Sequence, residues 1–262
     1  MPELNFRELL DYRALLEGFG ARYAARHVAE NPALMDGLNA ILERLTKASR
    51  RGNYEMFREA DRQLHETIME LSCVPGLADA WRVIWEKLAV YHRRSFREIT
   101  PDPRLFIEDH EYLVNMLATG EPAAAEDAVR THLEASWMRM TVLAKEPADS
   151  PPPLYLAAMY MKAYMQYPLR LGEVAKVACA SAGHLTRLFR LHHGLGFKAY
   201  LQKLRMEKTA MLLADTGLPI AAIARRAGYR SMPLFAQHFR RHHGRLPRKW
   251  RQEKNPRFRP AR

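Results

Sequence analysis

Residues 181–194 read SAGHLTRLFRLHHG, and residues 231–244 read SMPLFAQHFRRHHG. The second stretch repeats the first at an offset of 50 residues. The identical pairs are Ser181 and Ser231, Phe189 and Phe239, Arg190 and Arg240, His192 and His242, His193 and His243, and Gly194 and Gly244. A repeat of this length predicts two copies of one supersecondary unit.

Each copy has the pattern of a helix, a tight turn and a second helix. A short apolar segment precedes each copy, at 172–178 and at 220–228. Ser181 and Ser231 stand where an N-cap belongs, because their hydroxyls can accept a bond from a first-turn amide. Leu185 and Phe189, like Phe235 and Phe239 in the second copy, recur at helical spacing and are expected to face inward.

The opposite face of each second helix carries hydrogen-bonding side chains, as a DNA-recognition helix does. The candidate DNA-binding residues are Ser181, Gly183, His184, Thr186, Arg187, Arg190, Ser231, Gln237, Arg240 and Arg241. Residues 197–215 between the copies form an uninterrupted helical pattern, which spans roughly 28 Å at 1.5 Å per residue. This length suits two recognition helices in successive major grooves of double-stranded DNA, about 34 Å apart.

The segment from about 154 to 251 resembles the DNA-binding domain of AraC/XylS-type transcription regulators. The resemblance rests on Leu185-Thr-Arg-Leu-Phe-Arg190, on Arg205, Ala210 and Leu212-Leu213, on Ile223-Ala224 and Ala227-Gly228-Tyr229, on Phe235 and Phe239-Arg240, and on Gly244, Pro247 and Arg251. In that family, three positions after the turn commonly reach bases or the backbone. They are Gly183, Thr186 and Arg187 in the first copy, and Pro233, Ala236 and Gln237 in the second. The resemblance therefore implies that base reading rests more on the first helix.

Charge divides the chain in the same way. Residues 1–153 hold 19 Lys and Arg against 25 Asp and Glu, a balance of −6, whereas residues 154–262 hold 22 against 4, a balance of +18. A strongly basic segment of this size is typical of a polyanion binder. No apolar run approaches the roughly 20 residues of a membrane-spanning helix.

The N-terminus lacks the charged-then-apolar pattern of a secretion signal. The two cysteines, Cys73 and Cys179, lie in different predicted domains, and we expect both to be small buried side chains in a reducing compartment. The sequence therefore predicts a cytoplasmic protein.

The fold is predicted to be all-α. Four prolines at 145–153 indicate an extended linker, which separates a helical domain at 1–144 from a DNA-binding domain at 154–252, followed by a basic tail at 253–262. Helical patterns at 5–27, 33–49, 54–71, 77–96, 101–117 and 121–143 favour an N-terminal antiparallel bundle. The C-terminal domain combines two helix-turn-helix motifs with a long linker helix.

Four polar residues interrupt the apolar faces of this bundle. Asp61 and His65 lie one turn apart on the third helix, His110 lies on the fifth and His132 on the sixth. Unpaired buried polar groups are costly, and a divalent metal would satisfy all four together. The alternative is that each histidine is a core residue bonded to a carbonyl.

The region from Leu9 to Met140 is similar to the FCD effector-binding domain of GntR-family regulators. The similarity rests on Arg13-x-x-x-Glu17, Asp61-x-x-x-His65, Asp109-His110, the turn Gly120-Glu-Pro-Ala-Ala and Arg130-Thr-His132. It implies that Asp61, His65, His110 and His132 bind a divalent metal such as Zn, Ni or Mn, which helps to hold a small carboxylate metabolite. Arg13 could clamp that carboxylate, or could simply pair with Glu17.

We therefore expect a ligand-responsive transcription regulator rather than an enzyme. Its expected partners are double-stranded DNA and a small carboxylate, without a membrane, and a homodimer is left open. One alternative is a metal-dependent enzyme, because a histidine-bound cation with an open position can activate water. Another is an architectural DNA-binding protein without an effector.

Overall fold

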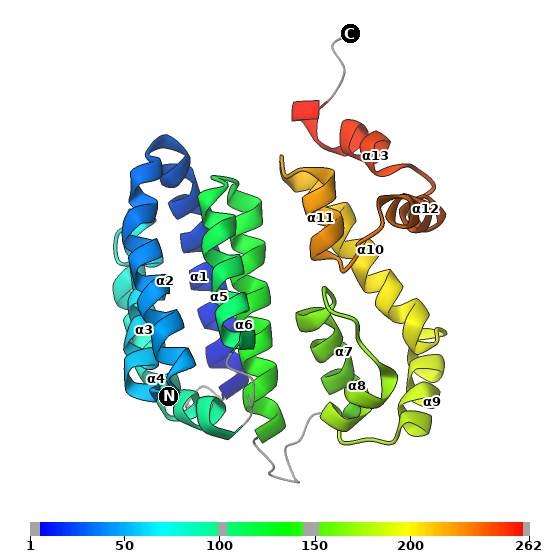
Figure 1. Ribbon diagram of the computed structural model, residues 1–262, viewed down its shortest axis with the longest axis horizontal. Helices are drawn as coiled ribbons and strands as arrows, with labels where there is room; N and C mark the ends of the chain where they lie inside the picture. Colours follow the sequence, from blue (N-terminus) through cyan, green and yellow to red (C-terminus); the bar gives the residue numbers. More distant parts are fainter. Residues whose placement is uncertain (1–5, 99–103, 144–151, 259–262) are drawn as a thin grey trace. The chain divides into compact units, whose positions relative to one another are not determined.

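The computed structural model describes residues 6–98, 104–143 and 152–258, and these residues are helical with turns between the helices (Figure 1). They contain no β-strand, so the prediction of an all-α fold is confirmed. The chain divides into two compact units, residues 1–145 and 146–262. Most of the predicted linker at 145–153 lies outside the described residues.

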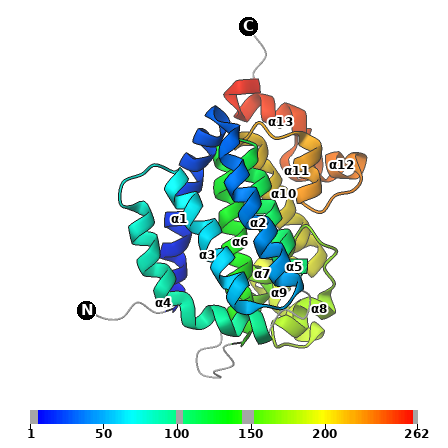
Figure 2. The same cartoon turned by 60° about the vertical axis from the view of Figure 1, so that its left-hand side comes forward.

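The N-terminal unit is a helical bundle (Figure 2). Its helices are α1 (Phe6–Glu30), α2 (Met35–Arg50), α3 (Tyr54–Leu71), α4 (Leu77–Glu98), α5 (Arg104–Ala118) and α6 (Pro122–Leu143), with a 3-10 turn, η1 (Pro32–Leu34), before α2. All six match helical patterns in the sequence. Asn53 caps α3, because its side chain accepts a hydrogen bond from the Met56 amide.

Helix α1 lies at the centre of this bundle. It packs against α6, α3 and α4, while α2 packs against α3 and α5. Small residues on α1 permit these close contacts, since Ala21, Ala24 and Ala25 are fully buried. The inward face of α1 also carries two charged residues, Arg13 and Glu17, which are buried among the apolar core.

The C-terminal unit contains both copies of the repeat. Its helices are α7 (Pro153–Tyr164), α8 (Leu171–Val177), α9 (Ala182–His193), α10 (Phe197–Asp215), α11 (Ile220–Arg226), α12 (Met232–His243) and α13 (Pro247–Lys254), followed by η2 (Pro256–Phe258). Helix α10 contacts α9 on one side and α11, α12 and α13 on the other, so it joins the two helix pairs as predicted (Figure 1).

The two copies fold alike. Helices α9 and α12 each have 12 residues, and each ends at a glycine in the left-handed conformation, with φ of 65° at Gly194 and 70° at Gly244. Phe189 and Phe239 occupy equivalent positions and are fully buried. Glycine adopts this positive φ without steric penalty, which explains why both helices stop there.

Replacing Ser181 by Ala is expected to lower the free energy of unfolding of the C-terminal unit by about 1 kcal/mol. The Ser181 hydroxyl accepts a hydrogen bond from the His184 amide at 3.1 Å, and alanine would leave that amide without it. Urea unfolding measures the loss. Ser181→Asp keeps a capping oxygen and should retain the wild-type stability, so equal losses in both variants would contradict the capping role.

The expectation that both cysteines are buried is wrong. Cys73 and Cys179 are free and exposed. Each follows the end of a helix in the left-handed conformation, with φ of 53° and 51°. Their amides close the helix ends by donating to the carbonyls of Glu70 and Lys176, which directs both side chains outward instead of into a core.

Within the described residues, no helix combines the length and apolar character that crossing a bilayer requires. Of the predicted basic tail at 253–262, residues 253–254 belong to α13 and residues 256–258 form η2. Asn255 between them is buried and donates to the Thr216 carbonyl, so this part of the tail packs on the end of α10.

Candidate functional site

The four polar residues of the N-terminal bundle lie together in its interior. Asp61 and His65 come from α3, His110 from α5 and His132 from α6. Each is at most 5% exposed. One ligand atom of each side chain can be chosen so that all four atoms lie within 4.8 Å of one another. We call these four residues the Asp-His cluster.

Asp61 is the centre of this cluster. Its Oδ1 lies 2.7 Å from Nε2 of His110 and 3.5 Å from Nε2 of His65. The imidazole rings pack against one another, with centroids 4.4 Å apart for His110 and His132 and 5.1 Å apart for His65 and His132. A carboxylate and three imidazoles therefore converge from three helices.

This donor set fits a divalent metal ion. One carboxylate oxygen and three imidazole nitrogens are ligands of Zn²⁺ and of similar transition metals. Ligand atoms on a tetrahedral zinc ion lie roughly 3.4 Å apart, given bonds of about 2.1 Å, and the four atoms of the cluster, all within 4.8 Å of one another, would have to adjust to that spacing. Nε2 of His65, which faces Asp61, is buried without an aligned hydrogen bond. Such a group costs free energy that a metal bond would recover.

The cluster extends to a second carboxylate that the sequence analysis did not assign to the site. Oε2 of Glu17 lies 2.7 Å from Nδ1 of His65. Its Oε1 accepts hydrogen bonds from Arg13 Nε at 2.5 Å and from Trp81 Nε1 at 2.6 Å. One sequence feature pointed to Glu17: it lies one turn from Arg13 on the same inward face of α1. The contact between Glu17 and His65 of α3 could not be predicted from the sequence, because the two residues lie far apart along the chain.

Arg13 is buried beside the cluster. It forms the intrahelical ion pair with Glu17 that the sequence analysis weighed, and its guanidinium lies 4.9 Å from the ring centroid of Trp85. Arg13 thus reaches the Asp-His cluster through Glu17. Its role toward a ligand stays a prediction.

Burial and charge shift the pKa values of these groups strongly. Burial raises the pKa of Glu17, but the charges of Arg13 and His65 outweigh it and hold the pKa at about 2. Burial lowers the pKa of His65, but the nearby carboxylates of Glu17 and Asp61 raise it to about 9. Burial likewise raises the pKa of Asp61, and contacts with His110 and His65 bring it well below its usual value. Metal-free protein is therefore stabilised here by ion pairs.

The pH dependence of stability follows from these shifts. The lowered pKa of Glu17 gives stability that is present above pH 4.5 and is lost as the pH falls through 2. The raised pKa of His65 gives stability that is full below pH 6.5 and is lost as the pH rises through 9. We expect chelator-treated protein to gain most from this pair between pH 4.5 and 6.5. Urea unfolding across pH measures it, and a flat profile from pH 6.5 to 9 would contradict it.

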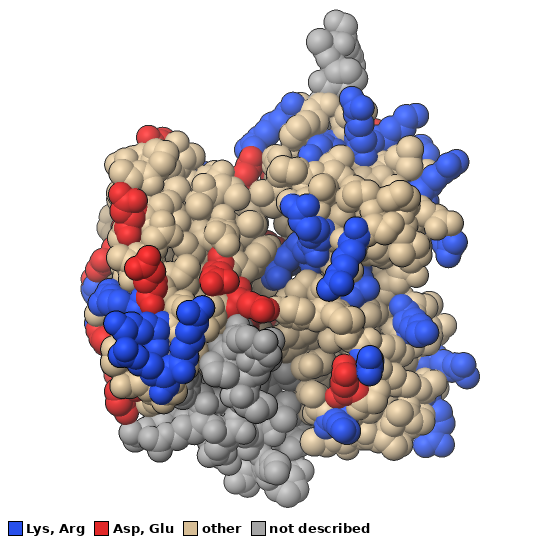
Figure 3. Space-filling model, viewed as in Figure 1, with Lys and Arg blue, Asp and Glu red and all other residues tan. Residues whose placement is uncertain are grey.

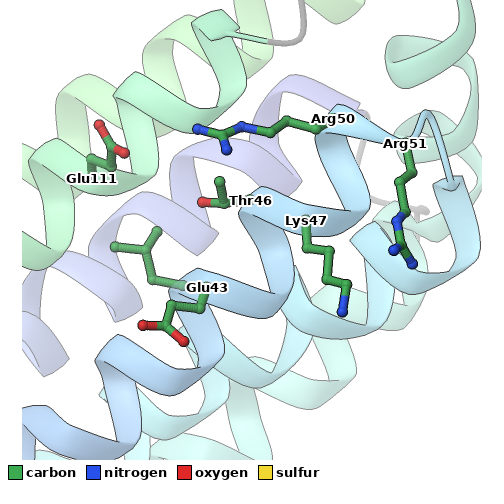
Figure 4. A pocket seen from close by; sticks show the side chains of 7 residues that line it. Glu43, Thr46, Lys47, Arg50, Arg51 and Glu111 are labelled. Atoms are coloured by element: carbon green, nitrogen blue, oxygen red, sulfur yellow. The ribbon is translucent and has the colours of Figure 1, made fainter.

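The N-terminal unit also has a surface groove of about 480 Å³ between α2 and α5 (Figure 4). It is lined by Leu42, Glu43, Thr46, Lys47, Arg50, Arg51 and Glu111. In Figure 4, Arg50 extends toward α5, whereas Lys47 and Arg51 point to the other side of α2. None of the Asp-His cluster residues lines the groove, so it is a separate feature.

The predicted DNA-binding residues lie on the outer faces of α9 and α12 and at their capping residues. All are exposed except Thr186, which is half-buried and donates its hydroxyl hydrogen to the Ala182 carbonyl. The hydroxyls of Ser181 and Ser231 cap the helices, since each accepts a hydrogen bond from an amide of the first turn. Lys and Arg side chains dominate the charged surface of this unit (Figure 3).

The C-terminal unit has a cavity of about 940 Å³. Residues from the segment before α8, from α10, from α11 and the turn after it, and from α12 line it, including Lys198, Arg205, Arg225 and Arg230 but no acidic residue. Arg205 is held in place, because it donates to the carbonyls of Met165 and Tyr167. The charged side chains that line this cavity are therefore cationic.

Comparison with known protein families now accounts for both units. Residues 8–135 match the family model of the FCD domain, and residues 174–253 match that of a helix-turn-helix domain. The chain carries an FCD domain followed by an AraC-type helix-turn-helix domain. Both resemblances in the sequence analysis are thus confirmed. The Asp-His cluster lies wholly within the FCD domain.

Named transcription regulators are similar to part of this chain. The chain is 29% identical over 132 residues to the regulatory protein PocR of Salmonella typhimurium, covering 50% of this chain and 43% of PocR. It is 33% identical over 90 residues to the HTH-type transcriptional regulator GlxA of Rhizobium meliloti, covering 34% and 28% of the two chains. The chain spans less than half the length of the relatives it matches first.

One solved structure is also similar to part of the chain. A transcriptional regulator with an AraC-type DNA-binding domain, from Chromobacterium violaceum, is 30% identical, covering 44% of this chain and 99% of that chain with a TM-score of 0.39.

Proposed function

We propose that the protein is a one-component transcription regulator that senses a small molecule through its FCD domain and binds operator DNA through its C-terminal unit. The observation that carries this proposal is the Asp-His cluster, buried inside one unit of a chain whose other unit presents two matching basic helices. Named transcriptional regulators among the relatives support the DNA-binding half.

DNA recognition would use the exposed faces of α9 and α12. Arg187 and Gln237 occupy equivalent exposed positions in the two helices. Arginine can contact a guanine edge with two hydrogen bonds, and glutamine can do the same with adenine. Phosphate contacts from the surrounding Lys and Arg residues would add affinity without sequence preference.

Sensing would use the Asp-His cluster and Arg13. Zinc, nickel or manganese are the candidate ions, and an ion that accepts more than four ligands would hold a carboxylate in addition to the four protein ligands. Asp61, His65, His110 and His132 would hold the ion. Arg13, once released from Glu17, could pair with the carboxylate of a metabolite in a bidentate arrangement.

The effector can alter DNA binding only if it binds two arrangements of the protein with different affinity. Couplings of this kind are typically about 1–3 kcal/mol, which corresponds to roughly a 5- to 150-fold change in affinity. By the same linkage, operator DNA would change the affinity for the effector by the same factor.

Selection of binding sites from a random DNA pool tests the proposal. We expect the full chain to enrich one sequence with two half-sites separated by about one duplex turn, because α9 and α12 are joined by a single helix. Small carboxylic acids are then screened, with zinc present, for changes in affinity for that sequence. If no sequence is enriched over random DNA, the chain is an architectural DNA-binding protein and the proposal fails.

A metal-dependent enzyme is the second candidate function. The observation that favours it is the same cluster, since a histidine-bound ion with an open position can activate water. Turnover of a small carboxylate by the zinc-loaded chain, abolished in His110→Ala, would favour the enzyme over the sensor.

A further inference from the structure

Glu17 links three helices at the edge of the Asp-His cluster. It lies on α1 and is fully buried, and its contacts are His65 on α3, Trp81 on α4 and Arg13 one turn away on α1. A buried carboxylate is costly unless charged or hydrogen-bonded partners surround it. Here the partners differ between its two oxygens.

The two carboxylate oxygens of Glu17 have different partners. Oε1 accepts both hydrogen bonds, from Arg13 Nε at 2.5 Å and from Trp81 Nε1 at 2.6 Å. Oε2 lies 2.7 Å from His65 Nδ1, an ion-pair contact in which the ring is not aligned for a hydrogen bond. An ion pair with Arg13 alone would need only Oε1. The second oxygen is therefore available to act on His65.

The orientation of His65 depends on which of its nitrogens is engaged. Nδ1 faces Glu17 at 2.7 Å and Nε2 faces Asp61 at 3.5 Å. Histidine ligands of metals commonly give their other ring N–H to a carboxylate, which fixes the tautomer and makes the ligating nitrogen more basic. The carboxylate 2.7 Å from Nδ1 and the cluster on the Nε2 side would give this arrangement once the ring turns into line with Oε2 of Glu17.

We propose that Glu17 is a positioning residue of the metal site: anchored by Arg13 and Trp81, its carboxylate holds His65 through Nδ1 so that Nε2 is presented to the ion. This inference rests on the proposed metal-dependent sensing. It also connects the ion to Arg13, because one carboxylate contacts both Arg13 and His65. Movement of Arg13 toward an effector would change the position of the Glu17 carboxylate and therefore the orientation of His65.

The test compares zinc affinity in wild type, Glu17→Gln and Glu126→Gln, using the full chain and competition with a chromophoric chelator. Glutamine keeps the volume of Glu17 but removes the charge that faces His65. The expected result is a loss of roughly 10- to 100-fold in zinc affinity for Glu17→Gln. Glu126 is the matched control, because its ion pairs with Arg22 and Arg130 lie outside the cluster. Glu126→Gln should bind zinc as wild type does.

The outcomes separate the two proposals. If wild type binds no zinc, the metal-dependent function fails and this inference fails with it. If wild type binds zinc and Glu17→Gln binds it equally well, only the role of Glu17 is overturned. The visible absorption spectrum of the cobalt-loaded chain shows whether Glu17 is itself a ligand. If the spectrum of Glu17→Gln showed that a direct ligand had been lost, Glu17 would bind the ion and the positioning role would be overturned.

A second measurement does not depend on the folding of a variant. Long-range nitrogen–proton correlation spectra of the zinc-loaded wild type report which ring nitrogen of His65 carries a hydrogen. The proposal expects the hydrogen on Nδ1 and none on Nε2. A hydrogen on Nε2, with Nδ1 bound to zinc, would overturn it.

Discussion

Replacing His110 by Ala is expected to lower the zinc affinity of the full chain about a hundredfold. Zinc sites with four protein ligands bind with about 10–16 kcal/mol, so one ligand accounts for roughly 3 kcal/mol. Since about 1.4 kcal/mol corresponds to a factor of ten, the loss is near two orders of magnitude. His110 is a direct test because its Nε2 already lies 2.7 Å from Asp61 at the centre of the cluster.

Chelator competition and elemental analysis of the purified chain measure this loss. His27→Ala is the matched control, because His27 lies in the same unit and its Nδ1 lies 2.7 Å from the Leu71 carbonyl, away from the cluster. The control should keep about one divalent ion per chain. Equal zinc content in wild type and His110→Ala, with the fold intact, would mean that the cluster is a packed core rather than a metal site.

Replacing Arg187 by Ala is expected to weaken operator binding by about 1–3 kcal/mol relative to random DNA. Arg187 is exposed on α9, and a bidentate contact with guanine contributes discrimination of this size. Competitive binding of selected and random duplexes at one salt concentration measures it, since phosphate contacts make both affinities depend on salt.

Gln237→Ala provides the comparison within the same molecule. Gln237 lies 50 residues after Arg187, at the same place on α12. The first helix is expected to carry more of the base reading, so this variant should lose less discrimination. If Arg187→Ala lowered affinity for operator and random DNA equally, Arg187 would contact phosphate and the assignment of base reading to α9 would be wrong.

The sequence predicted the helices well because their signals are local. The range of α10 at 197–215 follows directly from its apolar spacing, and the matching serine and glycine of each repeat mark where α9 and α12 begin and end. Helices α7 and α13 were not singled out. Each begins at a proline, so the turn signal and the helix signal overlap.

The candidate site could be predicted only in part. Periodicity placed the three histidines on inward faces, and the structure brings them together with Asp61. Glu17 was missed as a neighbour of His65, because a contact between α1 and α3 depends on how the helices pack. The burial of Cys73 was predicted wrongly for a related reason. Residue type favoured the interior, but the left-handed backbone after α3 directed the side chain outward.

Control of DNA binding by the Asp-His cluster is tested by the operator affinity of the full chain with zinc and small carboxylic acids, and after removal of zinc by a chelator, with His110→Ala in parallel. We expect zinc with a bound carboxylate effector to change the operator affinity of wild type by roughly 5- to 150-fold, and we expect His110→Ala not to respond. A wild-type affinity that is the same with bound zinc and without it, in the presence and absence of small carboxylic acids, would contradict the claim that the Asp-His cluster controls DNA binding.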